Sequence, residues 1–327
     1  MKHFYSSFII TFIGLGFALY YGSWEALYIT FLLAVLEVSL SFDNAVVNAK
    51  VLNTMDPIWK KRFILWGIPI AVFGMRFVFP ILLVSIVGGL GMFETFDVAL
   101  NDPDRYFAIL SSSEQLIFAF GGAFLIMVFL DFFFEEDKEV KWIKIIEDTA
   151  VVNRFSNVAN IELIISIAIG LFLTYITHNV DIAIAYFSGV LLHSLLSSVD
   201  DFLPANGVRS GLAGFIYLEV LDASFSFDGV IGAFALSSDI FIIMVGLGIG
   251  AMFVRSLTIY FVEKKILSEF IYLEHGAHYA IGALAVIMFI KMFFHISEVV
   301  TGTIGMGLII IAFIHSIQVN KKRVSKK

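Results

Sequence analysis

The chain has 327 residues, of which 59% are hydrophobic and 15% are charged, and it contains no cysteine. Soluble domains carry about 25% charged residues, so this composition indicates a polytopic membrane protein with the lipid bilayer as its main partner. The lack of cysteine excludes disulfides and thiolate metal sites, and the net charge of −7 disfavours nucleic acid as a partner.

Ten apolar segments follow one another along the chain, and each approaches the roughly 20 residues that a membrane-spanning helix needs. The second, third and seventh are long, which predicts tilted or broken helices. The segments cover residues 4–21, 26–51, 63–90, 115–134, 161–176, 182–198, 210–236, 240–262, 277–295 and 299–319.

Lysine and arginine residues are concentrated in alternate connecting segments. With ten helices, the positive-inside rule places all these segments in the cytoplasm together with both chain termini. The acidic segment from Glu94 to Asp104 then falls on the opposite side. The basic residues lie within 50–62, 138–154, 264–265 and 321–327 and at position 209.

One acidic motif occurs twice. Residues 36–47 read LEVSLSFDNAVV and residues 221–232 read LDASFSFDGVIG, and they align without a gap. The copies lie 185 residues apart, as from Asp43 to Asp228, and Glu37 aligns with Asp222. Such self-similarity indicates a duplicated structural unit.

The two copies fall in helices of opposite direction if there are ten spans. We therefore predict an all-α membrane protein with about ten transmembrane helices in a 5+5 inverted-topology repeat, as in many secondary transporters. The first half covers residues 1–176 and includes a cytoplasmic insertion at 135–160. The second half covers residues 177–327 and ends in a basic cytoplasmic tail.

The repeated acids are the strongest candidates for function. An ionisable group at the bilayer centre costs about 2.5–3.5 kcal/mol on insertion scales. Glu37 and Asp222 lie near the centres of their helices, while Asp43 and Asp228 lie six residues further on, about 9 Å along an ideal helix. Two acids at mid-depth and one on either side could pass a cation by alternating access.

The polar neighbours of these acids favour a hard divalent cation such as Mn²⁺, Mg²⁺ or Ca²⁺, because the available ligands are carboxylate, amide and hydroxyl oxygens. Asn44 and Gly229 follow the two aspartates and tolerate a left-handed backbone, so we expect both helices to unwind there. The predicted metal ligands are Glu37, Asp43, Asn44, Asp222 and Asp228, with Ser41, Asn48 and Ser226 in support.

Arg76 and Arg255 lie inside predicted helices and could pair with the acids when no cation is bound; structural ion pairs are the alternative. Four further residues are candidates for lining a path, although snorkelling or a structural pair would also explain the two nearest helix ends, Asp131 and Lys291. These four are Asp131, Glu162, His193 and Lys291. The chain lacks phosphate-binding, H-E-x-x-H and nucleophile motifs, so we expect neither an enzyme nor a bound cofactor.

The first copy, within SLSFDNAVVNAKVL, resembles the S-x-D-N element of the TerC family, in the broader group that includes LysE-type exporters. The second copy and the sequence up to VRSLTIYF resemble the D-S-I-P-A and G-L-R-x-L-Y-F elements of that family. The stretches WGIPIAVFGMRFVFP and FGGAFLIMVFLDFFFEE resemble a TerC-related subgroup of uncharacterised integral membrane proteins.

The resemblance implies a bacterial cytoplasmic (inner) membrane protein that handles Mn²⁺ or a similar cation, chiefly by export, with a historical link to tellurium resistance. Carried over by residue, the implied site consists of Asp43, Asn44 and Asp228 with Arg255.

The sequence therefore predicts an exporter of a divalent metal cation, with Mn²⁺ as the favoured substrate and protons as a hypothetical counter-ion. Two alternatives stay open. One is a non-transporting membrane scaffold or sensor for metal homeostasis or tellurium resistance, with residues 136–160 as its docking surface. The other is a LysE-like exporter of a small organic solute, with Arg76 and Arg255 as the anion-binding groups. Assembly into a homo-oligomer is compatible with all three.

Overall fold

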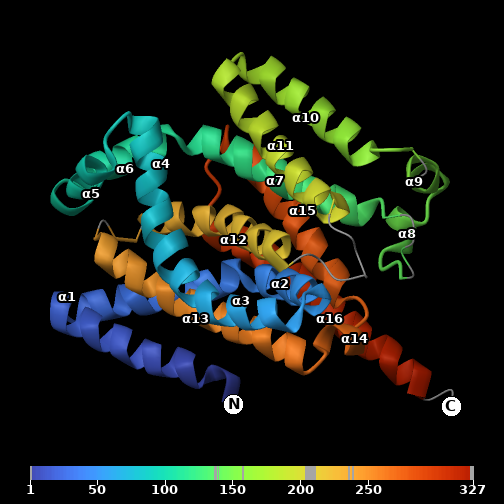
Figure 1. The fold of residues 1–327 in the computed structure, drawn as a ribbon, viewed down its shortest axis with the longest axis horizontal. Coiled ribbons are helices and arrows are strands. Elements are labelled where there is room, and N and C mark those ends of the chain that lie inside the picture. The colour runs from blue at the N-terminus through green and yellow to red at the C-terminus, as the bar shows by residue number, and fades with distance from the viewer. Residues whose placement is uncertain are drawn as a thin grey trace.

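The computed structural model describes residues 2–135, 138, 140–156, 158–202, 211–234, 236–237 and 239–324, and the regular structure of these residues is entirely helical (Figure 1). Among the described residues, six helices are long and apolar enough to cross a membrane. They lie within Lys2–Leu40, Glu114–Phe133, Val180–Ser198, Ile240–Glu263, Leu273–Lys291 and Glu298–Lys321. An all-α chain with several apolar helices is thus confirmed, while the ten-helix inverted repeat stays a prediction.

Helix α1 (Tyr5–Leu40) is a hairpin of two arms that wraps α13 (Ile240–Glu263). Its turn is at Gly22 and Ser23, where Ser23 has a left-handed φ of 79°. The first arm runs antiparallel to α13, since Ser7 donates a hydrogen bond to the Met252 carbonyl and the rings of Tyr21 and Phe241 meet. The second arm returns along α13 in the parallel direction, and the two blue arms are visible at the lower left of Figure 1.

The predicted second and third helices are both interrupted. Ser41 separates α1 from α2 (Phe42–Thr54). The third consists of α3 (Pro57–Pro69), the π-helix η2 (Ile70–Val78) and α4 (Phe79–Gly88). Single π-turns inside helices are frequent at functional sites.

The predicted unwinding is wrong for the second motif copy, and in the first copy the helix is interrupted at Ser41, two residues before Asp43, not at Asn44. Helix α12 (Gly211–Phe234) continues through residue 228, and Asn44 is not among the described residues with positive φ. Gly229 instead permits a close contact between helices, because the side chain of Glu37 lies against the place where a Cβ of residue 229 would stand.

Several short helices occupy segments that the sequence suggests are connections. Two of them, α5 and α6, form the acidic segment that follows α4, and α8 and α9 form part of the predicted cytoplasmic insertion. The remaining helices are α5 (Met92–Asn101), α6 (Pro103–Ser112), α7 (Glu114–Phe133), α8 (Lys144–Glu147), α9 (Ala150–Phe155), α10 (Ile161–Thr177), α11 (Val180–Phe202), α14 (Ile266–Glu269), α15 (Leu273–Lys291) and α16 (Glu298–Val324).

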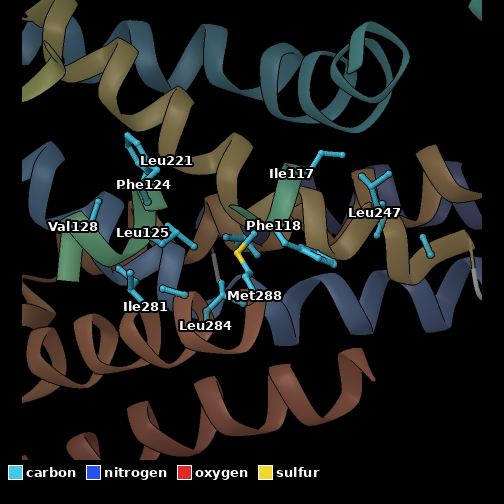
Figure 2. Close-up of a cluster of buried hydrophobic side chains, with 14 of the residues drawn as sticks. Ile117, Phe118, Phe124, Leu125, Val128, Leu221, Leu247, Ile281, Leu284 and Met288 are labelled. Atoms are coloured by element: carbon cyan, nitrogen blue, oxygen red, sulfur yellow. The ribbon is translucent and has the colours of Figure 1, made fainter. Parts of the chain in front are cut away.

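Helix α7 lies at the centre of the apolar core, between α11 and α15 (Figure 1). Phe124 and Leu125 of α7 are fully buried, and Met288 of α15 reaches the same cluster (Figure 2). Leu221 and Leu247 bring α12 and α13 into this cluster. The second motif copy is therefore anchored directly in the core by the leucine that precedes Asp222.

Two glycines set the distance between α13 and the second arm of α1. Gly246 and Gly250 have G-x-x-x-G spacing, which lets helix backbones approach closely in membranes. A Cβ on Gly250 would meet the side chain of Glu37 and the Ala34 carbonyl, and a Cβ on Gly246 would meet Leu33. This close contact determines where Glu37 lies along α13 and in which direction its side chain points.

Replacing Gly250 with alanine should destabilise the folded protein by about 1–3 kcal/mol, because the added methyl group overpacks the contact with α1. The measurement is the thermal unfolding midpoint of the purified chain in detergent. Gly16→Ala is the matched control, since no atom lies within 4 Å of its added Cβ. Equal midpoints for the two variants would contradict the proposed role of this glycine contact.

Candidate cation site

A buried charge network joins the two motif copies. Arg76 of η2 contacts Glu37 through Nη2 at 2.5 Å and Asp222 through Nη1 at 2.8 Å. Asn44 donates from Nδ2 to Asp222 Oδ1 at 2.6 Å, and Ser41 donates from Oγ to Glu37 Oε1 at 2.9 Å. The structure thus brings together three of the predicted ligands, Glu37, Asn44 and Asp222, around one arginine.

The π-helix positions the arginine of this network. Segment η2 contacts both α12 and α13, so Arg76 enters between the helix that carries Asp222 and the helix that supports Glu37. The Arg76 and Glu37 side chains are each only 1% exposed. Charges at such depth persist only when they are paired and hydrogen-bonded.

The contacts across the network respect the sequence repeat. Asp222 and Gly229 are the counterparts of Glu37 and Asn44 in the second copy. Glu37 Oε2 lies 3.1 Å from the place of a Gly229 Cβ, and Asn44 bonds to Asp222. If each residue is replaced by its counterpart in the other copy, the Glu37–Gly229 contact becomes the Asp222–Asn44 contact. Moving from 37 to 44 in the first copy means moving back from 229 to 222 in α12, so the two segments cross antiparallel.

Four buried oxygen atoms at this crossing have no hydrogen-bond partner in the described part of the chain. They are Glu37 Oε2, Asn44 Oδ1, Asn48 Oδ1 and Glu219 Oε1. An unsatisfied buried polar group costs about 1–3 kcal/mol, so a cluster of four calls for an explanation. Carboxylate and amide oxygens are the ligands that hard divalent cations prefer.

No three His, Asp or Glu side chains among the described residues are arranged to hold a metal ion. At the crossing, Arg76 stands between Glu37 and Asp222 and supplies their positive counter-charge. A metal cation would therefore have to compete with this guanidinium.

Two predicted ligands lie elsewhere. Asp43 is buried but lines a separate cavity with Thr301 and with Ala280 and Leu284 of α15, and its Oδ1 accepts a hydrogen bond from the adjacent Asn44 backbone. The backbones of Ser226 and Asp228 belong to α12. Their side chains lie outside the described part of the structure, so the predicted roles of these two residues stay predictions.

A second arginine faces the same crossing from α13. Arg255 stacks on Phe63, with Cζ 4.3 Å from the ring centre, and lies against Gly67. It lines a cavity of about 20 Å³ together with Asn48 and Glu219. Glu219 was not predicted as a site residue; its position three residues before Asp222, on the same helical face, could have indicated it.

His193 Nε2 lies 3.3 Å from Asp131 Oδ2, and both residues line a cavity of about 290 Å³. Lys50, Glu135 and His278 also line this cavity. It lies at the end of α2 that the charge distribution assigns to the cytoplasm.

The other two residues predicted to line a path lie apart from this cavity. Lys291 pairs with Glu298 at 3.3 Å and lines a cavity of about 220 Å³ with Glu114 at the opposite end of α7 and α15. Glu162 lies in the first turn of α10, which packs on α11 and α7, and lines none of the cavities described here. The structure therefore gives Glu162 no role at the candidate site.

The predicted cytoplasmic insertion is fixed to the helix bundle by a carboxylate that the sequence did not single out. Glu147 is 3% exposed and accepts hydrogen bonds from the Ile143 backbone and from the Tyr279 hydroxyl. Lys138 lies 3.7 Å from it, and burial lowers the pKa of the Lys138 ammonium while Glu147 opposes that shift. Trp142 donates from Nε1 to His315 at 3.0 Å.

Residues 42–323 match the DUF475 family, which is described as a protein of unknown function. No curated protein and no solved structure matches the chain. The matched region includes Asn44, Arg76, Asp222 and Arg255, and Glu37 lies just before it.

Substituting Arg76 with glutamine should destabilise the protein by about 3–5 kcal/mol, because two buried carboxylates lose their counter-charge. Unfolding in detergent at increasing denaturant concentration measures this. Arg62→Gln serves as the control, since Arg62 is an exposed residue stacked on Trp59. If the two variants unfold together, the network does not carry the stability that its burial implies.

Proposed function

The chain belongs to the DUF475 family, and we propose that it is an integral membrane transporter that exports a divalent metal cation, with Mn²⁺ as the favoured substrate. The observation that carries the proposal is the buried network of Glu37, Arg76 and Asp222 at the crossing of the two motif copies. Unpaired oxygens of Glu37 and Asn44 beside it add donors that suit a hard cation.

Arg76 acts in this proposal as a tethered cation. Two carboxylates face a single guanidinium, so the network keeps an excess of one negative charge when all three groups are ionised. An arriving divalent cation takes over the carboxylates of Glu37 and Asp222, and Arg76 withdraws along η2. Its return expels the ion, which gives the cycle two alternating occupants of one site.

The supporting geometry for a path is the pair of cavities at opposite ends of α7 and α15. One is lined by Asp131 and His193, and the other by Lys291 and Glu298. The charge distribution favours the Asp131 end as the cytoplasmic one, with both termini on that side of a bacterial cytoplasmic membrane. The antiparallel crossing of the motif copies supports alternating access by inverted repeats.

Purified protein in liposomes should transport Mn²⁺, and Glu37→Gln or Asp222→Asn should lower the rate at least tenfold. Each variant removes a charge that attracts the cation. The measurement is the uptake of Mn²⁺ by quenching of an enclosed fluorescent dye. Glu25→Gln, an exposed carboxylate near the α1 turn, should transport at the wild-type rate. A wild-type protein that transports no ion would contradict the proposed function.

A scaffold or sensor is the second candidate, and the insertion favours it. The insertion is anchored by Glu147 and Trp142 while Ile145 in α8 is 88% exposed, as a docking surface would require. Mn²⁺ binding without transport, together with loss of cellular function in Ile145→Asp, would select this candidate. Export of an organic solute is disfavoured, because the cavity at Arg255 has only about 20 Å³ and pockets for organic ligands span roughly 300–1,000 Å³.

A further inference from the structure

A small cavity beside the charge network has the size and chemistry of a single-ion position. It has a volume of about 20 Å³ and is lined by Asn48, Glu219, Asp222 and Arg255, among others. A water-sized particle needs about 10–15 Å³ on this measure, so the cavity accommodates one water molecule or one bare cation.

This cavity borders the Glu37–Asp222 network, because Arg76 and Asp222 also line it, and it extends from there by about one helical turn to Asn48 and Glu219. Asn48 follows Asn44 by four residues in α2, and Glu219 precedes Asp222 by three residues in the antiparallel α12. Three or four residues correspond to about 5–6 Å along a helix. Both shifts are toward the Lys50 end, so Asn48 and Glu219 face each other on the side of the larger Asp131 cavity.

The lining atoms lack the partners that burial normally demands. The Asn48 side chain is 5% exposed, and its Oδ1 accepts no hydrogen bond from any described residue. Glu219 Oε1 has no hydrogen-bond partner either. An amide oxygen and a carboxylate oxygen, both unpaired and facing one small cavity, supply about a third of the six oxygen ligands that a hard cation takes.

Arg255 differs from Arg76 in how it is held. Its Nε and Nη2 atoms have no hydrogen-bond partner in the described chain, although Glu219 and Asp222 lie within electrostatic range. Its guanidinium rests on the Phe63 ring and in the space left by Gly67. Packing and long-range charge therefore hold Arg255, and displacing it breaks no hydrogen bond of those two nitrogens.

We propose that Asn48, Glu219 and Asp222 form a second binding position for a small divalent cation, and that the Arg255 guanidinium competes with the ion for it. The identity of the ion rests on the proposed function. The ion passes between this position and the Glu37–Asp222 network by exchanging Asp222, which both positions share. Arg76 borders both positions, whereas Arg255 adds a second guanidinium at the Asn48–Glu219 position.

Substitutions of Glu219 and of Arg255 should change the affinity for the ion in opposite directions. Glu219→Gln removes a negative ligand, so Mn²⁺ affinity at one position should fall at least tenfold. Arg255→Gln removes the competing positive charge, so Mn²⁺ affinity should rise about tenfold in protein that folds. A structural role for Arg255 would give no such increase.

The test counts Mn²⁺ bound to the full-length chain in detergent, from the loss of the paramagnetic resonance signal of free Mn²⁺. It compares the wild type with Glu219→Gln, Arg255→Gln and the double variant. The double variant removes both charges of the pair, so it should fold where Arg255→Gln alone does not. The double variant should bind no Mn²⁺ at this position, while the exposed Glu25→Gln should bind as much Mn²⁺ as the wild type does.

Wild-type binding in Glu219→Gln, or unchanged affinity in folded Arg255→Gln, would overturn the inference. If Arg255→Gln fails to fold, wild-type affinity in the double variant would overturn it. Transport by the wild type with unaltered binding in Glu219→Gln would leave the proposed function standing and remove this position. Mn²⁺ binding that depends on Glu219, in a protein that transports no ion, would support this position and contradict the proposed function.

Discussion

The pairing of one arginine with two carboxylates in a dry environment is the interaction on which the other features depend. Separated, each of these charges carries a desolvation penalty of several kcal/mol in the membrane interior. Together they draw η2, α12 and the second arm of α1 to a single point. The same pairing makes the point responsive to added positive charge, because any cation that reaches Glu37 and Asp222 changes the force that holds Arg76.

Packing around this point is built for a short approach between helices. Gly250 admits Glu37, Gly229 admits its second carboxylate oxygen, and Gly67 admits the guanidinium of Arg255. Small residues at helix contacts are usual in membranes, where apolar side chains gain nothing from leaving lipid. Here each of the three glycines faces a charged side chain, so the close approach of the helix backbones also determines where the charges lie.

Much of this architecture is readable from the sequence. The motif repeat pointed to Glu37, Asn44 and Asp222, and their depth in apolar segments pointed to pairing with Arg76 or Arg255, because a buried charge needs a partner. In the structure Arg76 makes the contacts to Glu37 and Asp222. The sequence did not reveal that Asp43 faces α15 instead, since a six-residue separation turns it off the polar face by an amount that tertiary packing decides. Glu219 and Glu147 were missed because each lies outside the repeated motif and gains its importance from partners distant in the chain. The π-helix around Arg76 has no sequence signature beyond Pro69. The direction in which it points the Arg76 side chain could therefore be learned only from the structure.

The hairpin of α1 around α13 has a consequence for biogenesis. Ser7 and Met252 are in contact although 245 residues separate them. At roughly 5–20 residues per second, synthesis of the intervening chain takes about 12–50 s. The first arm is therefore synthesised well before the helix α13 against which it packs. During this interval Glu37 lacks the glycine surface of α13, and Arg76 lacks its second carboxylate partner, Asp222. The charge network is therefore completed only when α12 and α13 join the earlier helices.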